Sequence, residues 1–111
     1  MSWRVIEVNG IMGVYYDMEM WRNEVGKYGV IETKIIENGR EITAEQANRR
    51  REEYLRKVIT NSCENLKKSG IRYVVLMTYA QMTEYKPKTF LPVNTMEGLA
   101  LYKRKPKFLK N

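Results

Sequence analysis

The sequence predicts an α+β fold in which one long amphipathic helix packs across one face of a β-sheet. Three observations lead to it: a hairpin signal at Asn9-Gly10, a capped helical stretch from Thr43 to Gly70, and an apolar run over residues 71–80. The resulting element order is βββαβ, a two-layer meander sheet with one helix, followed by a short C-terminal element. A chain of 111 residues suits one domain with a single modest core. We expect that domain over residues 1–102 and a basic tail over 103–111.

The N-terminal region predicts strands. Asn9-Gly10 separates apolar runs over residues 3–8 and 11 to about 20, and both turn residues tolerate the positive φ of a tight hairpin turn. The alternation from Asp17 to Trp21 extends the second strand. The alternative is a short helix that Asp17 caps and Gly26 ends.

Residues 30–37 predict a third strand, which Asn38-Gly39 ends. Residues 71–80 are apolar on both faces and predict a central strand. Residues 81–95 contain two prolines and predict a loop. Residues 98–103 predict a short edge strand or a helical turn, and the tail beyond them is expected to be frayed.

The long helix has the strongest local signals. Thr43 and Gln46 form a capping box, Lys67 and Lys68 complement the dipole of the last turn, and Gly70 provides a left-handed C-cap. These limits predict a helix over about residues 44–69. The apolar positions recur at helical spacing on one face: Ala44, Ala47, Leu55, Val58, Ile59, Cys63 and Leu66.

The composition excludes several kinds of site. The chain has no histidine and one cysteine, Cys63, so histidine-based triads, histidine-ligated zinc and an internal disulfide framework are excluded. We expect a cytoplasmic protein with no membrane partner. The chain has one cysteine, its start has no signal-peptide pattern, and no apolar run is long enough to cross a bilayer. No glycine-rich phosphate loop occurs, and no cofactor is expected. Abundant Lys, Glu, Ile, Val and Tyr with few Gln is typical of thermophile proteins.

Charge is distributed unevenly along the chain. The formal net charge is +7, with −2 over residues 1–42, +3 over 43–70 and +6 over 71–111. Such a field attracts a polyanion to one part of the molecule. The candidate nucleic-acid-binding residues are a helical arginine triplet and the basic residues of the tail: Arg49, Arg50, Arg51, Lys103, Arg104, Lys105 and Lys107.

Each of these groups has a structural alternative. Arg51 lies at the edge of the apolar stripe, where it can cover the core with its stem and pair with a glutamate instead of a phosphate. Tyr102 and Phe108 flank the tail cations, an arrangement that suits single-stranded nucleic acid because rings stack on bases. The alternative for the tail is a solvated terminus that aids solubility.

A second candidate site combines Asp17, Glu32 and Lys34. If the turn between the second and third strands lies near Glu24 and Val25, Asp17 lies opposite Glu32, and Glu32 and Lys34 share a strand face. Two carboxylates and a lysine can hold Mg²⁺ and position a water against a phosphodiester.

This arrangement and the βββαβ order resemble the PD-(D/E)xK nucleases over roughly residues 11–80. The resemblance implies catalytic roles for Asp17, Glu32 and Lys34, with Mg²⁺ held by the two carboxylates. The alternative is a cross-strand ion pair on a solvated sheet face.

From these observations we expect a small, basic, non-catalytic accessory protein that binds nucleic acid mainly through phosphate contacts. One alternative is an interaction or inhibitor protein that docks on an acidic protein surface. The other is the metal-dependent nuclease. A homodimer is expected as well, because one helix covers only part of a sheet and the uncovered face needs a partner or the C-terminal segment.

Overall fold

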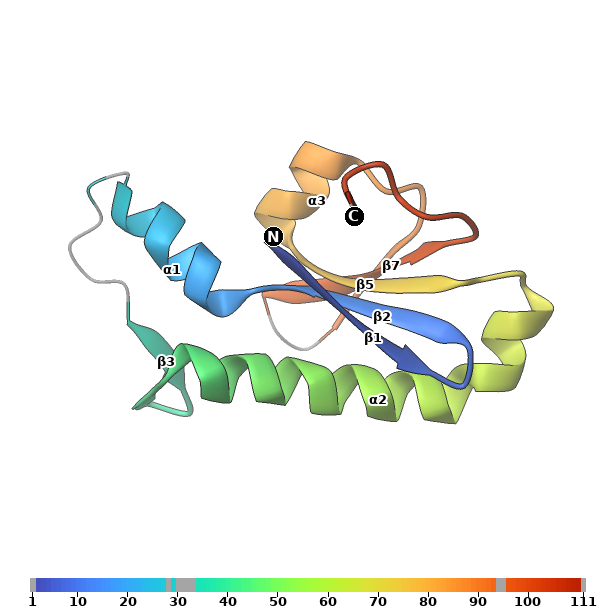
Figure 1. Cartoon of the computed structure of the whole chain (residues 1–111), viewed down its shortest axis with the longest axis horizontal. Helices are drawn as coiled ribbons and strands as arrows, with labels where there is room; N and C mark the ends of the chain where they lie inside the picture. Colours follow the sequence, from blue (N-terminus) through green and yellow to red (C-terminus); the bar gives the residue numbers. More distant parts are fainter. Residues whose placement is uncertain (1, 28, 30–33, 94–95, 111) are drawn as a thin grey trace.

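The computed structural model describes residues 2–27, 29, 34–93 and 96–110. Within these ranges it has the α+β fold expected from the sequence, with a five-stranded mixed sheet, a small two-stranded sheet and the long helix packed on the large sheet (Figure 1). The elements in chain order are β1 (Trp3–Val8), β2 (Ile11–Tyr16), α1 (Met18–Lys27), β3 (Ile35–Glu37), β4 (Arg40–Ile42), α2 (Ala44–Lys68), β5 (Tyr73–Thr78), α3 (Tyr79–Tyr85), β6 (Phe90–Pro92) and β7 (Glu97–Tyr102).

The strands of the large sheet lie in the order β1-β2-β5-β7-β6. β2 and β5 are parallel, and every other neighbouring pair is antiparallel. Parallel neighbours need a crossover of about a dozen residues or more. Here α1, the small sheet and α2 make that crossover, and β1 and β6 are left as the two edges of the sheet.

The strongest local signals of the sequence are confirmed. Asn9 and Gly10 have φ values of 51° and 85° and join β1 to β2. Thr43 and Gln46 form the complete capping box at the start of α2. After the helix, Gly70 has a φ of 74°.

The central strand of the large sheet is buried on both faces. In β5, Val74 and Leu76 contact the core beneath α2, whereas Val75 and Met77 contact a second core on the opposite face. This alternation confirms a central strand within residues 71–80, although the strand covers only Tyr73–Thr78, and Tyr79 and Ala80 belong to α3. α3 and the C-terminal segment lie on the second face, opposite α2 (Figure 1).

The second strand is shorter than expected. β2 ends at Tyr16 and α1 follows, so the strand extension through Trp21 is wrong. The short-helix alternative is correct in its start after Asp17, but Gly26 does not end the helix, which continues to Lys27. The Asp17 side chain is the cause, because its Oδ1 accepts a hydrogen bond from the Glu19 amide at 2.9 Å, as an N-cap residue does.

The expected third strand does not join the large sheet. β3 pairs with β4 through a turn at Asn38 and Gly39, whose φ values are 52° and 75°, so this Asn-Gly pair also makes a hairpin. Residues 30–33, the start of the expected strand, lie outside the described residues.

The expected loop over residues 81–95 contains two elements. α3 begins at a capping box of Thr78 and Gln81, and the short edge strand β6 ends at Pro92. β7 confirms a strand near residues 98–103, but it lies between β5 and β6 and is not an edge. None of the described helices is long and apolar enough to cross a membrane.

The tail is packed rather than frayed. Leu109 is buried, and its amide donates a hydrogen bond to the carbonyl of Pro106 at 3.1 Å. The Phe108 ring lies 4.8 Å from the Trp3 ring and 4.5 Å from the Tyr85 ring, centre to centre. Aromatic contacts of this kind fix the segment over the second face.

Candidate functional site

Two arginines of the triplet are paired with carboxylates on the surface. Arg49 contacts Glu45 one turn earlier in α2 at 3.0 Å, and Arg50 contacts Glu37 of β3 at 3.2 Å. Each pair is solvent-exposed and contributes little to stability. The carboxylates of Glu45 and Glu37 nonetheless offset the positive charge of the two arginines, which were expected to bind phosphate.

Arg51 has the structural role that the sequence offered as its alternative. Its guanidinium donates to the carbonyl of Ala47 at 3.2 Å and pairs with Glu97 of β7. The Arg51 and Glu97 side chains are only 20% and 17% exposed, so this pair lies between α2 and the start of β7 and is not presented to a polyanion.

The tail cations differ from the triplet. Lys103, Arg104, Lys105 and Lys107 are exposed. The two aromatic residues beside them are not available for stacking on bases, because Phe108 packs on Trp3 and Tyr102 packs on Phe108 at 6.0 Å. The tail therefore offers charge without exposed rings.

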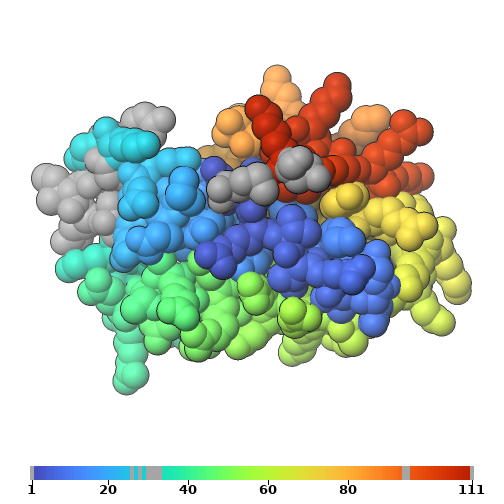
Figure 2. All heavy atoms as spheres, in the orientation of Figure 1, coloured from blue at the N-terminus to red at the C-terminus, as the bar shows by residue number. Residues whose placement is uncertain are grey.

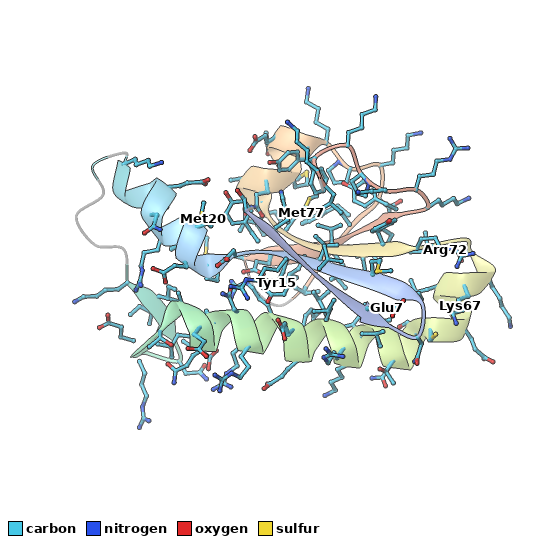
Figure 3. The ribbon with its side chains drawn as sticks, viewed as in Figure 1. Glu7, Tyr15, Met20, Lys67, Arg72 and Met77 are labelled. Carbon is cyan, nitrogen blue, oxygen red and sulfur yellow. The ribbon has the colours of Figure 1, made fainter. Side chains whose placement is uncertain are left out.

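The start of the tail lies beside the end of α2. The Arg72 amide donates to the Tyr102 carbonyl at 2.9 Å, and the stem of Lys103 lies 3.9 Å from the position that a β-carbon on Gly70 would occupy. Figure 3 shows Lys67 and Arg72 at the same end of the molecule.

This arrangement forms what we call the cationic end: Lys67, Lys68, Arg72, Lys103 and Arg104. All five side chains are exposed, and within the described part of the chain none of them has an ion pair. The sequence has one acidic residue, Glu64, between residues 60 and 75, and Figure 3 shows Glu7 at the same end of the molecule. The five cations outnumber these two carboxylates. Sequence reasoning assigned Lys67 and Lys68 only to the helix dipole and missed Arg72, because the pairing of β5 with β7 is what brings these residues to Lys103.

The second candidate site depended on Asp17, which is fully engaged in holding the fold. Its Oδ2 accepts from Arg4 at 3.0 Å, and its Oδ1 accepts from Asn48 at 3.2 Å in addition to the Glu19 amide. Asn48 in turn accepts from the Met18 amide at 2.9 Å. Asp17 thus joins β1, α1 and α2.

The electrostatics of Asp17 agree with this role. Burial raises the pKa of the carboxyl, but the hydrogen bonds from Arg4, Asn48 and the Glu19 amide outweigh burial and hold the pKa below its usual value. These partners therefore stabilise the charged carboxylate. Because both of its oxygens already accept hydrogen bonds, few lone pairs remain to bind a metal ion.

The strand that was expected to carry Asp17 is shorter than predicted. β2 ends one residue before Asp17, so Asp17 lies outside the strand on which the expected pairing with Glu32 was based. Glu32 lies outside the described residues, and Lys34 is exposed. Among the residues that are described, no group of three or more His, Cys, Asp or Glu side chains could hold a metal ion.

A wide groove of about 1050 Å³ crosses the sheet face opposite α2. Val5, Met12 and Tyr73 contribute to its lining, with aromatic residues from α1, α3 and the tail around them. At one side, the Tyr16 hydroxyl donates to Glu24 at 2.6 Å, and burial together with this bond raises the pKa of Tyr16 to about 12. The hydroxyl therefore stays protonated at neutral pH and is a poor general base.

Comparisons of the chain with protein-family models, with curated protein sequences and with solved structures find no match.

Proposed function

We propose that this protein binds nucleic acid without catalysis, through phosphate contacts made by the cationic end. The observation that supports the proposal is the contrast between two sets of basic residues. The arginine triplet is paired with glutamates, whereas the cationic end is exposed and has no ion pair in the described part of the chain.

The chemistry of this surface suits backbone recognition. Lysine and arginine side chains replace the counterions of phosphates, and the release of those counterions drives binding. Without exposed rings or a recognition element beside the cations, contacts to base edges are few and sequence discrimination is weak. We expect duplex and single-stranded DNA and RNA to bind with similar affinity.

Fluorescence anisotropy with labelled oligonucleotides at low salt tests the proposal. Changing Lys103 and Arg104 together to glutamine should weaken binding about 10-fold and lower the salt slope by about 1.4–1.8, since each lost phosphate contact removes about 0.7–0.9. The matched control changes Arg49 and Arg50 to glutamine, which removes the same charge from paired arginines. This control should change affinity less than about twofold, because screening limits distant charges.

Two outcomes would contradict this assignment. Binding that is absent at tens of micromolar protein and low salt would rule out a nucleic-acid function. Equal weakening by both double variants would mean that net charge alone, and not the cationic end, governs binding. If an acidic protein partner is retained after nuclease treatment while oligonucleotides do not bind, the cationic end contacts protein instead.

We also propose that the protein forms a homodimer, but through an edge of the large sheet and not through an uncovered face. The expectation from the sequence depended on an uncovered sheet face, and α3 and the C-terminal segment cover part of it. The reason for expecting a dimer is therefore the edge strands of the sheet, which can pair with strands of another chain.

A further inference from the structure

The two edges of the large sheet are unlike. β6 has three residues and ends at Pro92, and short strands with proline are a common protection against pairing with other chains. β1 has six residues and no proline. In Figure 2 the atoms of the β1–β2 hairpin reach the surface between α2 and the C-terminal segment. β1 is therefore the edge that is open to a further strand.

The register of β1 shows which backbone groups face outward. The Asp17 amide donates to the Ser2 carbonyl at 2.7 Å, which marks Ser2 and Asp17 as a hydrogen-bonded pair. Such pairs alternate along an antiparallel ladder. The inward-bonded residues of β1 are therefore Arg4, Ile6 and Val8.

The intervening residues Trp3, Val5 and Glu7 direct their amides and carbonyls away from β2. No backbone hydrogen bond from the described part of the chain reaches these groups. The Val5 side chain is 51% exposed at the centre of the strand. Unpaired groups along a regular strand favour the addition of another strand.

We propose that β1 pairs with β1 of a second copy of this chain, antiparallel, about a two-fold axis at Val5. In this register Val5 lies opposite the partner's Val5, and Trp3 lies opposite the partner's Glu7. All of the outward-facing amides and carbonyls of the three residues then form hydrogen bonds. The two sheets become one continuous sheet, and the exposed Val5 side chains cover each other.

The charges on β1 select this register. If the two-fold axis lay at Arg4, the two copies of Arg4 would lie opposite each other. If it lay at Glu7, the two copies of Glu7 would do so. Both registers are unfavourable because like charges directly opposite each other repel. Centring on Ile6 leaves Trp3 beyond the end of the partner's strand. The Val5 register pairs all three residues, with Arg4 opposite the partner's Ile6 and no like charges in contact.

A second copy fits this edge because the strand is complementary to itself about Val5. α2 packs mainly beneath β2, one strand in from the edge, and makes fewer contacts with β1. The two-fold axis places the two cationic ends at opposite ends of the dimer. The dimer does not depend on the nucleic-acid proposal, since its formation is measured with the protein alone.

Sedimentation velocity over a concentration series tests the dimer. The full chain should reach twice its mass of 13.2 kDa at high concentration. Val5→Lys puts a charge on each side of the two-fold axis and should raise the dissociation constant about 100-fold, because like charges across an interface cost several kcal/mol. Leu91→Lys on β6 is the matched control, since Leu91 is also 51% exposed, and it should leave the dissociation constant unchanged.

Hydrogen exchange tests the register. With increasing concentration, the amides of Trp3, Val5 and Glu7 should gain protection, while those of Arg4 and Ile6 are protected throughout. A chain that remains at 13.2 kDa at about millimolar concentration would overturn the proposal, as would equal dissociation by Leu91→Lys. A dimer in which the Val5 amide stays unprotected would show that another surface is used.

Discussion

Trp3→Ala is expected to lower the free energy of unfolding by about 3–5 kcal/mol, the usual cost of truncating a buried aromatic residue. The Trp3 side chain is 9% exposed and contacts Tyr16, Tyr85 and Phe108, at 5.1, 5.8 and 4.8 Å between ring centres. One ring thus connects β1, β2, α3 and the C-terminal segment. Urea denaturation at low micromolar concentration measures the change without a contribution from association.

The same substitution should release the C-terminal segment. We expect trypsin to cleave after Lys107 slowly while Phe108 is packed on Trp3, and we expect Trp3→Ala to accelerate this cleavage under conditions in which the protein is still folded. Trp3→Phe, which keeps an aromatic ring, is the control and should cleave at nearly the wild-type rate. If all three proteins are cleaved at the same rate, the segment does not depend on Trp3 for its position.

Asp17→Ala should lower the free energy of unfolding by about 2–4 kcal/mol, because it removes two hydrogen bonds that the carboxylate accepts. One caps α1 and comes from the backbone amide of Glu19, and the other comes from the buried side-chain amide of Asn48. Asp17→Asn should cost less, because an amide oxygen still accepts both bonds and only the ionic contact with Arg4 is lost. Chemical denaturation of the three proteins at neutral pH compares these effects.

The pH dependence of this difference follows from the lowered pKa of Asp17. Its pKa in the folded state lies below the value of about 3.9 in an unfolded chain, so its stabilising contribution is complete above that value. The contribution is lost as the pH falls through the folded-state pKa. The stability gap between wild type and Asp17→Asn should therefore narrow as the pH falls below about 4. A gap that stays constant from neutral pH to strong acid would contradict the charged role of Asp17.

The same pair of proteins tests the nuclease alternative. If Asp17 were a metal ligand, Mg²⁺ would bind the folded wild type and raise its unfolding midpoint, but would not do so for Asp17→Asn. We expect no Mg²⁺-dependent difference between them, because both carboxylate oxygens already accept hydrogen bonds. DNA cleavage by the wild type that stops with EDTA would contradict this expectation.

The sequence by itself determined the elements whose signals are local. Asn9-Gly10 predicted its hairpin because both residues adopt the positive φ that the turn requires. The capping box at Thr43 and the glycine at Gly70 set the limits of α2 correctly to within a residue. The same local logic was available at Thr78, where a second capping box starts α3, but the prolines downstream led to the prediction of a loop.

Only the tertiary structure decided which segments became neighbours. The pairing of Tyr73 with Tyr102 joins the end of α2 to the tail and creates the cationic end, while Arg51 is drawn to Glu97 across the fold. It also decided the role of Asp17, whose partners Arg4 and Asn48 are distant in sequence. The physical reason is that turns and caps are specified within a few residues, whereas strand partners are selected by burial and hydrogen bonding summed over the whole sheet.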